Sequence, residues 1–507
     1  MVATRLSINR FHVLCFLLWQ CALFFCCQQI FPIFYNYTPQ RVCDDDGFQF
    51  SGELCQLSAA EQCDELKNCS HVLILKPPFH SMVEHFELYC DKAYDATLVS
   101  TIQFLGVLVG TVIYGHLGDR FGRRPVSFCG ILIGIIFGVG SGLAPNWQIF
   151  AILRFMCGTS IACILVVFYT YVVELIRPEQ RVFLRSFFNW GYARVVFTLV
   201  CMACDHWRLA AMVTPLLVSP TLLAIAFLLP ETPKWYAGKG RLEEAKKAMR
   251  RINYLGGAET ENDLVNVDVG CSERSYTMKD LLEDRTIAKR TAILCILWFA
   301  TSLSAFGSDL NSRNLLGNFY VNQLASALMI ALMKIFVFLL DTYYESFDRR
   351  KLHQIPQLLM IICYTTIMCL QMLVSDTSCD GESWNDWTII AVNIMGVSFI
   401  ELTWDACYLV AVECFPTHVR TIGMGTCSLF ARIGALVAPQ MAYLSVIYHP
   451  APYIVVVSIG IISLGISVAF LPNTKGVDLA SIRNDARKQT LEKMYNNAHN
   501  ISTKPQV

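Results

Sequence analysis

Long apolar stretches alternate with short polar segments along almost the whole chain. Twelve of these stretches are close to the ~20 residues that an α-helix needs to cross the ~30 Å hydrocarbon core of a bilayer. This pattern predicts an all-α membrane protein with twelve transmembrane helices, and it makes the lipid bilayer the first expected partner. The stretches lie at 11–34, 97–117, 125–143, 148–175, 182–203, 209–229, 291–309, 318–344, 355–374, 387–413, 421–444 and 452–471.

Composition and charge placement support this fold class and add an orientation. Hydrophobic residues make up 54% of the 507 residues and charged residues only 16%, against about 25% charged residues in soluble domains. The net charge is zero. With the N-terminus inside, however, thirty Lys and Arg residues lie in segments that face the cytoplasm and six in segments that face outward. Because basic loops stay on the cytoplasmic side, we expect both termini in the cytoplasm.

The first apolar stretch shares its position with a signal peptide, and Arg5 and Arg10 precede it. Its apolar run continues from Phe11 to Phe34, beyond the roughly 7–15 residues of a signal-peptide core, and no small-residue cleavage site follows. We therefore expect a retained first helix.

The segment 36–96 is predicted to be a large extracellular loop. It contains five cysteines and two glycosylation sequons, which begin at Asn36 and Asn68. Both features belong on the oxidising side of a membrane. Five cysteines cannot all pair among themselves, so a sixth, from the outward loop 375–386, is a candidate partner and the connectivity is open. The disulfide candidates are Cys43, Cys55, Cys63, Cys69, Cys90 and Cys379.

The largest polar block divides the twelve helices into two bundles of six. Residues 241–254 in this block carry an apolar stripe at helical spacing, which predicts an amphipathic surface helix. The chain has no nucleotide-binding G-x-x-x-x-G-K-[ST] and no metal-binding spacing. We therefore expect no enzyme activity, cofactor, bound metal or nucleic-acid partner. The predicted organisation is a cytoplasmic N-terminus with helix 1 (1–35), the cysteine-rich glycosylated loop (36–96), helices 2–6 (97–229), a central cytoplasmic loop with amphipathic helices (230–290), a second six-helix bundle (291–471) and a cytoplasmic tail (472–507).

Seven short motifs occur in the order that is typical of one family of membrane carriers. They are FELYCD (86–91), GHLGDRFGRR (115–124), RFMCG (154–158), PETPKW (230–235), ECFPTHVR (413–420), ARIG (431–434) and LPNTKG (471–476). Together they resemble the major facilitator superfamily and, more narrowly, its organic cation/anion/carnitine transporter family of solute carriers. The resemblance implies two six-helix bundles that rock about a central site and transport a small organic ion by alternating access.

The second half departs from the family pattern in the loop between helices 8 and 9. Here Asp348 stands where the family has a glycine, between an acid at Glu345 and the arginines Arg349 and Arg350. Glycine tolerates a crowded or left-handed turn that most residues do not. This departure is the one feature that favours an alternative function, a non-transporting pseudo-transporter with a sensing or scaffolding role.

The resemblance also implies that charged residues near the cytoplasmic helix ends form a gate. An acid followed seven residues later by an arginine occurs in both halves, as Glu174 with Arg181 and as Glu413 with Arg420, which is the internal repeat expected of this architecture. The alternative is ordinary interfacial charge on solvated loops. The gating candidates are Asp119, Arg120, Arg123, Arg124, Arg154, Glu174, Arg181, Glu231, Glu413 and Arg420, of which Arg154 is expected to pair inside the first bundle.

Charged residues inside the predicted spans indicate where a substrate binds. A charge at mid-bilayer costs ~2.5–3.5 kcal/mol, so it usually faces a cavity or a partner. Glu401 and Asp405 are one turn apart on helix 10 and share a face. They could bind a cation, titrate a proton or neutralise a base, either Arg432 or Lys334, and the sequence leaves these alternatives open. The family position of Arg432 implies contact with an anionic group.

Aromatic residues on helices 7 and 10 are candidate walls of the same site. Together with these residues, the resemblance implies a plasma-membrane carrier of small organic cations, anions or zwitterions such as carnitine-like solutes. A coupling ion or counter-substrate and the oligomeric state are open. A sugar or polyol carrier of the same superfamily is a second alternative, which the cysteine-rich loop and the buried charges disfavour. The aromatic candidates are Trp298, Phe299, Phe306, Trp404 and Tyr408.

Overall fold

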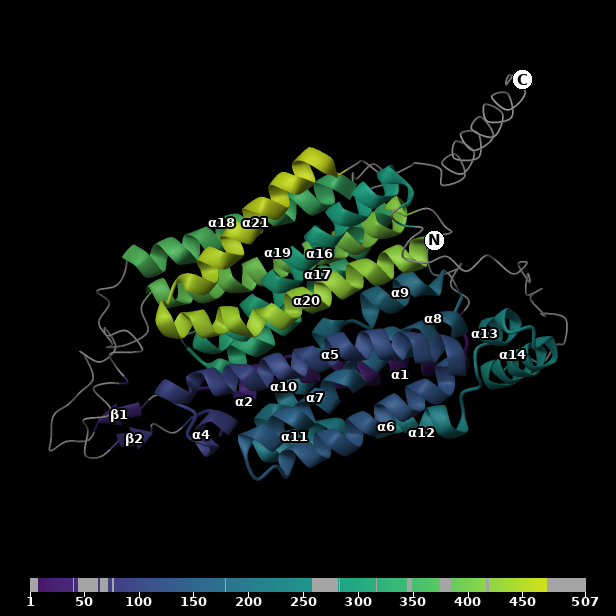
Figure 1. The fold of residues 1–507 in the computed structure, drawn as a ribbon, viewed down its shortest axis with the longest axis horizontal. Helices are drawn as coiled ribbons and strands as arrows, with labels where there is room; N and C mark the ends of the chain where they lie inside the picture. Colours follow the sequence, from purple (N-terminus) through teal and green to yellow (C-terminus); the bar gives the residue numbers. More distant parts are fainter. Residues whose placement is uncertain are drawn as a thin grey trace, which may run out of the picture.

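The described part of the chain is almost entirely helical (Figure 1). Twelve helical segments in it are long and apolar enough to cross a membrane. This finding confirms the all-α fold class and the twelve spans predicted from hydropathy. The structure is a computed structural model, and it describes residues 8–39, 41–43, 63, 72–74, 77–177, 179–257, 281, 283–315, 317–343, 349–373, 384–415 and 419–471.

The first six spans form one bundle, called the N half, and the last six form a second bundle, called the C half. The N half comprises α1 (Arg10–Cys26), η1 (Cys27–Gln29) and α2 (Pro32–Tyr35) as span 1; α5 (Ala93–Phe121); α6 (Arg123–Gly142); α7 (Trp147–Cys163), η4 (Ile164–Phe168) and α8 (Tyr169–Leu175) as span 4; α9 (Gln180–Phe187) and α10 (Trp190–Cys204) as span 5; and α11 (Trp207–Leu216) and α12 (Ser219–Phe227) as span 6. The C half comprises α16 (Arg285–Asn311) with η6 (Ser312–Asn314), α17 (Phe319–Tyr343), α18 (Arg349–Leu373), α19 (Trp384–Cys414), α20 (Arg420–Ile447) and α21 (Ala451–Phe470).

Span 5 is broken, and the break matters for the site described below. The helix α9 ends at Phe187. The side chain of Asn189 accepts hydrogen bonds from the backbone N–H groups of Gly191 (2.9 Å) and Tyr192 (3.4 Å) and so caps the start of α10. An asparagine at this position satisfies N–H groups that a new helix start would otherwise leave unpaired. Span 5 therefore presents its side chains from two separately oriented helices.

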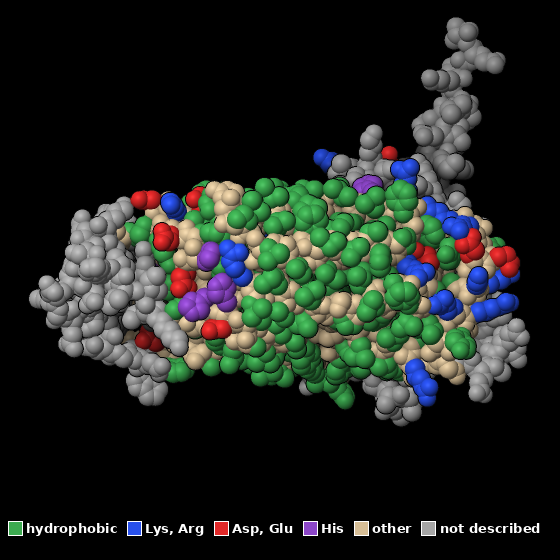
Figure 2. All heavy atoms as spheres, turned by 90° about the horizontal axis from the view of Figure 1, so that it is seen from below, with side chains coloured by type: hydrophobic (Ala, Val, Ile, Leu, Met, Phe, Trp, Pro, Cys, Tyr) green, Lys and Arg blue, Asp and Glu red, His purple; other side chains and the backbone are tan. Residues whose placement is uncertain are grey.

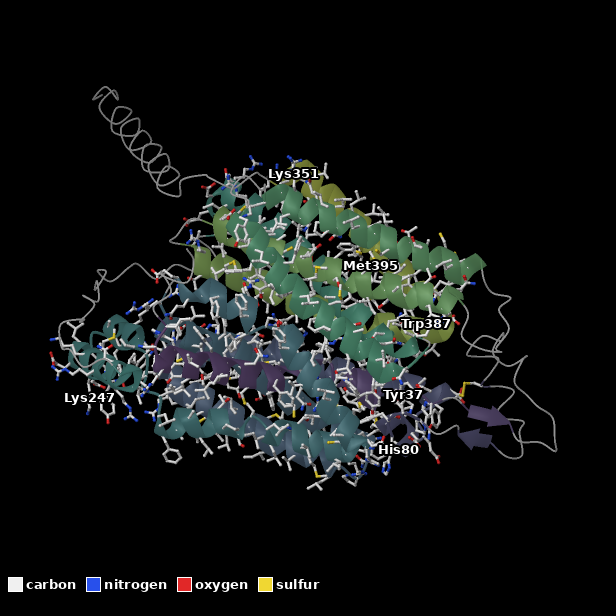
Figure 3. The ribbon with its side chains drawn as sticks, turned by 180° about the vertical axis from the view of Figure 1, so that it is seen from behind. Tyr37, His80, Lys247, Lys351, Trp387 and Met395 are labelled. Atoms are coloured by element: carbon white, nitrogen blue, oxygen red, sulfur yellow. A yellow bond between two sulfur atoms is a disulfide. The ribbon has the colours of Figure 1, made fainter. Side chains whose placement is uncertain are left out.

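The molecule has two polar ends separated by an apolar middle. Figure 2 shows hydrophobic side chains covering this middle band, while Lys and Arg gather at one end. Within the spans, side chains such as Ile152 (63% exposed) and Phe227 (71% exposed) face outward, as expected of a surface that contacts lipid. We call the end with Lys247 and Lys351 the basic end and the end with Tyr37 and His80 the disulfide end (Figure 3).

The disulfide end carries the long loop of the N half. A disulfide joins Cys63 to Cys90, two of the predicted candidates. Short strands β1 (Arg41–Cys43) and β2 (Val72–Ile74) pair antiparallel, and a one-turn helix, α4 (Met82–His85), lies nearby. The other residues predicted to act at this end, Cys55, Asn68, Cys69 and Cys379, lie outside the described residues, as does the side chain of Cys43.

Asn36, the first of the two predicted glycosylation sites, has a buried side chain in this fold. The residue is 3% exposed, and its amide nitrogen donates to the carbonyl oxygen of Ala96 (3.1 Å) and to the Ser100 hydroxyl (2.8 Å). The amide nitrogen is the atom that would carry the glycan. The sequon at Asn68 is therefore the remaining candidate.

The segment that joins the halves begins with two surface helices at the basic end. They are α13 (Pro233–Gly238) and α14 (Leu242–Gly256), and the second coincides with the predicted amphipathic helix. Ala245, Ala248 and Ile252 are the buried residues of α14. Gly257, with φ of +77°, ends it in the left-handed conformation that glycine adopts without strain.

The two halves meet closely at the disulfide end. Helices α5 and α20 contact there through the Gln440 amide, which donates to the Thr101 hydroxyl (3.1 Å), and through the rings of Tyr94 and Tyr443 (5.4 Å between centroids). The Arg313 guanidinium also reaches across and donates to the Asn36 carbonyl oxygen (3.2 Å). In Figure 1 the two helices diverge toward the basic end.

Candidate functional site

A cluster of four charged residues lies inside the membrane-spanning region. On α19, Glu401 and Asp405 both reach the Lys334 ammonium of α17, each at 2.9 Å. The two acids therefore lie on one face of the helix, as predicted, and the base that they pair with is Lys334 rather than Arg432. A lysine held between two carboxylates leaves one negative charge, because two acids face one base.

The fourth member of the cluster is Arg185 on α9, which comes from the other half of the molecule. Its Nη2 lies 3.3 Å from Oδ1 of Asp405, and its guanidinium carbon lies 4.2 Å from the ring centroid of Tyr408. An arginine this close to an aromatic face and a carboxylate is held both by a cation–π contact and by a charge-assisted hydrogen bond. With Arg185 included, the four charges cancel.

Three of the predicted aromatic residues form one wall of this site. The Trp298 ring lies 4.3 Å from the Tyr408 ring and 5.6 Å from the Trp404 ring, measured between centroids. Trp298 is 1% exposed, so it supports Tyr408 from behind. The other two predicted residues are placed elsewhere. Phe306 packs against Phe104 of α5 (5.2 Å), and the partly buried Phe299 belongs to the main hydrophobic core.

Arg432 on α20 has no carboxylate partner among the described residues. Its Nε is buried and makes no hydrogen bond. The titratable groups that interact electrostatically with it are Tyr408 of α19 and Cys26 of α1, which belong to different halves. Arg432 thus interacts electrostatically with groups of both halves. An unpaired guanidinium in a low-dielectric region is a strong site for an anionic group.

A second ion pair joins the halves nearer the disulfide end. Arg194 of α10 donates through Nη1 to Asp309 Oδ1 of α16 (2.7 Å) and through Nη2 to Gln323 Oε1 of α17 (3.0 Å). The Gln323 amide in turn donates to the Ser312 hydroxyl (2.8 Å). Both members of the ion pair are buried, with side-chain exposures of 0% and 11%. Arg194 and Asp309 lie within the predicted spans 182–203 and 291–309, but the sequence did not indicate that they pair.

Arg154 stays inside the N half, as the sequence predicted. Its guanidinium donates to Gln103 Oε1 (2.9 Å), to Gln28 Oε1 (2.8 Å) and to the Gln28 carbonyl oxygen (3.1 Å). It also lies over the rings of Phe31 and Tyr35 at 5.2 and 5.7 Å. Neutral amides and aromatic faces satisfy this buried charge without a carboxylate, so Arg154 ties spans 1, 2 and 4 together.

Three gating candidates of the first half, Asp119, Arg123 and Glu174, form a network at the basic end. Arg123 pairs with Asp119 (2.9 Å) and Glu174 (3.7 Å), and its Nη1 donates to the Gly118 carbonyl oxygen (2.7 Å). Arg120 lies over the neighbouring Phe121 ring (5.3 Å) and takes no described part in the network.

Glu231 acts on the backbone rather than on an arginine side chain. Its carboxylate accepts hydrogen bonds from the backbone N–H groups of Arg123 (3.1 Å), Arg124 (3.0 Å) and Thr232 (2.9 Å). Burial raises the pKa of this carboxyl, while the N–H donors oppose the shift. The Arg124 side chain instead donates to the carbonyl oxygens of Ile225 (3.0 Å) and Ala226 (2.7 Å) at the end of α12.

The second half repeats the arginine–glutamate contact of the first. Arg349, the first residue of α18, pairs with Glu413 at 3.0 Å, as Arg123, the first residue of α6, pairs with Glu174. Arg420 donates to the Phe415 carbonyl oxygen (3.2 Å). For Arg181 the structure describes no ion pair. At the basic end, each of these described ion pairs joins residues of one half. Glu345 and Asp348 lie outside the described residues.

Two halves of six helices, in-half charge networks at one end and ion pairs across the middle define a membrane carrier of the major facilitator fold. The family model described as sugar (and other) transporter matches residues 56–486. The chain therefore belongs to this family of the major facilitator superfamily. It is also similar to proteins named as organic cation transporters, which agrees with the resemblance of its motifs.

Individual relatives agree with this placement. The chain is 58% identical over 482 residues to an uncharacterized protein of Caenorhabditis elegans, covering 94% of this chain and 95% of that protein. It is 25% identical to an organic cation transporter protein of Drosophila melanogaster (87% and 80% covered) and 28% identical to solute carrier family 22 member 16 of Xenopus laevis (80% and 71% covered).

Among solved structures, the xylose transporter XylE from E. coli in a partially occluded inward-open conformation superposes with a TM-score of 0.61. The sequences are 14% identical, with 92% of this chain and 99% of that chain covered. At this identity the likeness shows the fold alone, so it lends the sugar-carrier alternative no support of its own.

Proposed function

We propose that this transporter carries small organic ions that bear a carboxylate or a similar anionic group, and that it favours zwitterions. The observation that supports this proposal is the state of Arg432, a buried guanidinium that interacts electrostatically with groups of both halves and has no carboxylate partner among the described residues. Glu401 and Asp405 do not neutralise it, because Lys334 occupies both. The anionic group of a solute is the partner that this guanidinium suits best.

The transport step follows from the arrangement of the halves. The N half and the C half separate alternately at the two ends while the solute binds between Arg432 and the Tyr408 wall. The in-half pairs of Arg123 and Arg349 hold each bundle rigid near the basic end. We place the basic end in the cytoplasm because of the charge asymmetry of the loops. The plasma membrane is the location that the family resemblance implies.

The substitution Arg432→Lys tests the role of the guanidinium. Lysine keeps the charge but loses the planar pair of donors that grips a carboxylate. We expect the KM for carboxylate-bearing solutes to rise about tenfold or more, since a charge-assisted hydrogen bond contributes roughly 1.5–3 kcal/mol. The KM for pure cations should change little. The measurement is uptake of labelled cations, anions and zwitterions, normalised to protein at the cell surface.

Arg154→Lys is the matched control, because this buried guanidinium stays inside the N half. It should lower the amount of folded protein without changing which solutes are preferred. Equal losses for both solute classes in Arg432→Lys, or none for either, would show that Arg432 has a structural role, and the anionic-substrate assignment would then fail.

A further inference from the structure

We infer that Arg185 occupies the site that receives the cationic group of the transported solute, and that the solute replaces Arg185 during each cycle. This inference deepens the proposed function and rests on it. It assigns the ligand class at this end of the site as an ammonium or guanidinium cation. It also assigns Arg185 a role that the sequence does not show, that of a tethered stand-in for the substrate.

The geometry around Arg185 is that of a cation-binding site. Its guanidinium carbon lies 4.2 Å from the Tyr408 ring centroid, and Nη2 lies 3.3 Å from the Asp405 carboxylate. An aromatic face combined with an adjacent carboxylate is the arrangement that binds ammonium and guanidinium groups. Trp298 and Trp404 extend the wall behind and beside the ring.

The charges of the C half support the same assignment. Glu401, Asp405 and Lys334 lie together on α19 and α17 and carry a net charge of −1. Arg185 brings this charge to zero, but it is the one member that belongs to the N half. When the halves separate on this side, Arg185 leaves with the N half. A monovalent cation from the solute then restores neutrality, which avoids a stranded negative charge in the membrane.

Arg185 is held loosely enough to be displaced. Its side chain is 39% exposed, whereas the side chain of Arg194, the other arginine of span 5 that pairs across the halves, is 0% exposed. Arg194 makes two hydrogen bonds to the C half, at 2.7 and 3.0 Å, and Arg185 makes one, at 3.3 Å. The break between α9 and α10 lets the two arginines move separately.

A tethered cation has a consequence for the transport cycle. A carrier whose site is neutralised only by its solute must keep the solute bound to close, and it therefore works as an exchanger. A carrier that supplies its own cation closes and reorients without solute, and it therefore supports net flux. Arg185 should thus lower the apparent affinity for cations by competition and at the same time permit net uptake.

The experiment compares Arg185→Gln with the wild type, Arg185→Lys and Arg194→Gln, using labelled benzylguanidine, trimethylglycine and benzoate. In Arg185→Gln we expect the KM for benzylguanidine and trimethylglycine to fall about tenfold if Arg185 fills the site roughly 90% of the time. Net uptake into empty vesicles should slow relative to exchange in preloaded vesicles. Arg185→Lys should keep the wild-type ratio of net uptake to exchange, and the KM for benzoate should not fall in any variant.

Arg194→Gln removes the other cross-half arginine of span 5, so it controls for a general loosening of the interface. It should not lower the KM for benzylguanidine. Binding of benzylguanidine to purified protein gives a readout that is independent of flux, and Arg185→Gln should bind it more tightly than the wild type. Absence of flux with tighter binding would contradict the proposed transport but support the tethered cation. Equal or weaker binding in Arg185→Gln would overturn this inference, whatever the flux.

Discussion

At the residue scale, the start of span 3 is held by the carboxylate of Glu231, which lies outside the GHLGDRFGRR motif (115–124). Gly122 has φ of +109°, and a Cβ there would lie 2.5 Å from Oε2 of Glu231. The absent side chain lets this carboxylate reach the first N–H groups of α6, those of Arg123 and Arg124. A negative charge at a helix N-terminus satisfies unpaired donors and complements the helix dipole. The family resemblance suggested a gating role for Glu231, and its contacts indicate that it fixes the start of span 3.

Glu231→Ala should therefore destabilise the protein by about 1 kcal/mol, the typical cost of losing a helix cap. Thermal unfolding of purified protein in detergent, followed by the monodisperse fraction that remains, measures the effect. Asp119→Asn is the comparison, because the Asp119 side chain that pairs with Arg123 is 78% exposed, and ion pairs of exposed carboxylates add little stability. A drop in stability for Asp119→Asn as large as that for Glu231→Ala would contradict this division of roles.

The sequence predicted which charged residues lie inside the spans better than it predicted which residues they pair with. Periodicity was sufficient to place Glu401 and Asp405 on one face, since four residues make one helical turn. It could not choose Lys334 over Arg432 as their base, because that choice depends on how α17 and α20 lie around α19. Arg185 was missed because it stands at the border between a polar loop and span 5, where hydropathy does not decide whether a side chain is inside the membrane.

At the element scale, glycines allow close helix contacts of two kinds, one within a half and one between the halves. In α5, a Cβ at Gly106 would collide with the Phe155 carbonyl oxygen of α7, and one at Gly110 would lie 2.7 Å from the Thr159 Cα. This small-x-x-x-small spacing lets two helices of the same half pack backbone to backbone. Gly191 of α10 instead approaches the backbone of Ala331 in α17, across the halves.

Substituting these glycines should therefore have different effects. Gly106→Val overpacks the N half, so we expect a loss of about 1–3 kcal/mol in stability and less folded protein. Gly191→Val wedges α10 away from α17, so we expect folded protein at near wild-type levels with reduced transport. Surface-normalised uptake and thermal stability in detergent distinguish the two. A Gly191→Val variant that unfolds like Gly106→Val would show that the contact between α10 and α17 is needed for folding, and would contradict this division.

At the scale of the whole molecule, both halves contain the same arginine–glutamate pair, but the loop before it is irregular in the C half. Arg349 pairs with Glu413 as Arg123 pairs with Glu174, although the second loop lacks the family's glycine. The retained contact weakens the argument for a pseudo-transporter, whose single support was that loop. The twelve spans were predictable because apolar runs of this length have few other uses. The contacts between the halves were not, since each depends on side chains that lie more than a hundred positions apart in the sequence, as Arg185 and Asp405 do.

The orientation of the whole molecule gives the last prediction. If the disulfide end faces the extracellular side, the glycan should be attached at Asn68, because the Asn36 amide is buried and hydrogen-bonded to Ala96 and Ser100. Glycosidase treatment of the wild type from a eukaryotic host should increase its gel mobility, and Asn68→Gln should already migrate at the treated position. Asn36→Gln should keep the glycan, while its lost hydrogen bonds lower the yield of folded protein. A wild-type protein that glycosidase leaves unchanged would count against this topology, and a glycan lost only in Asn36→Gln would show that the span 1 terminus is open when the chain is modified.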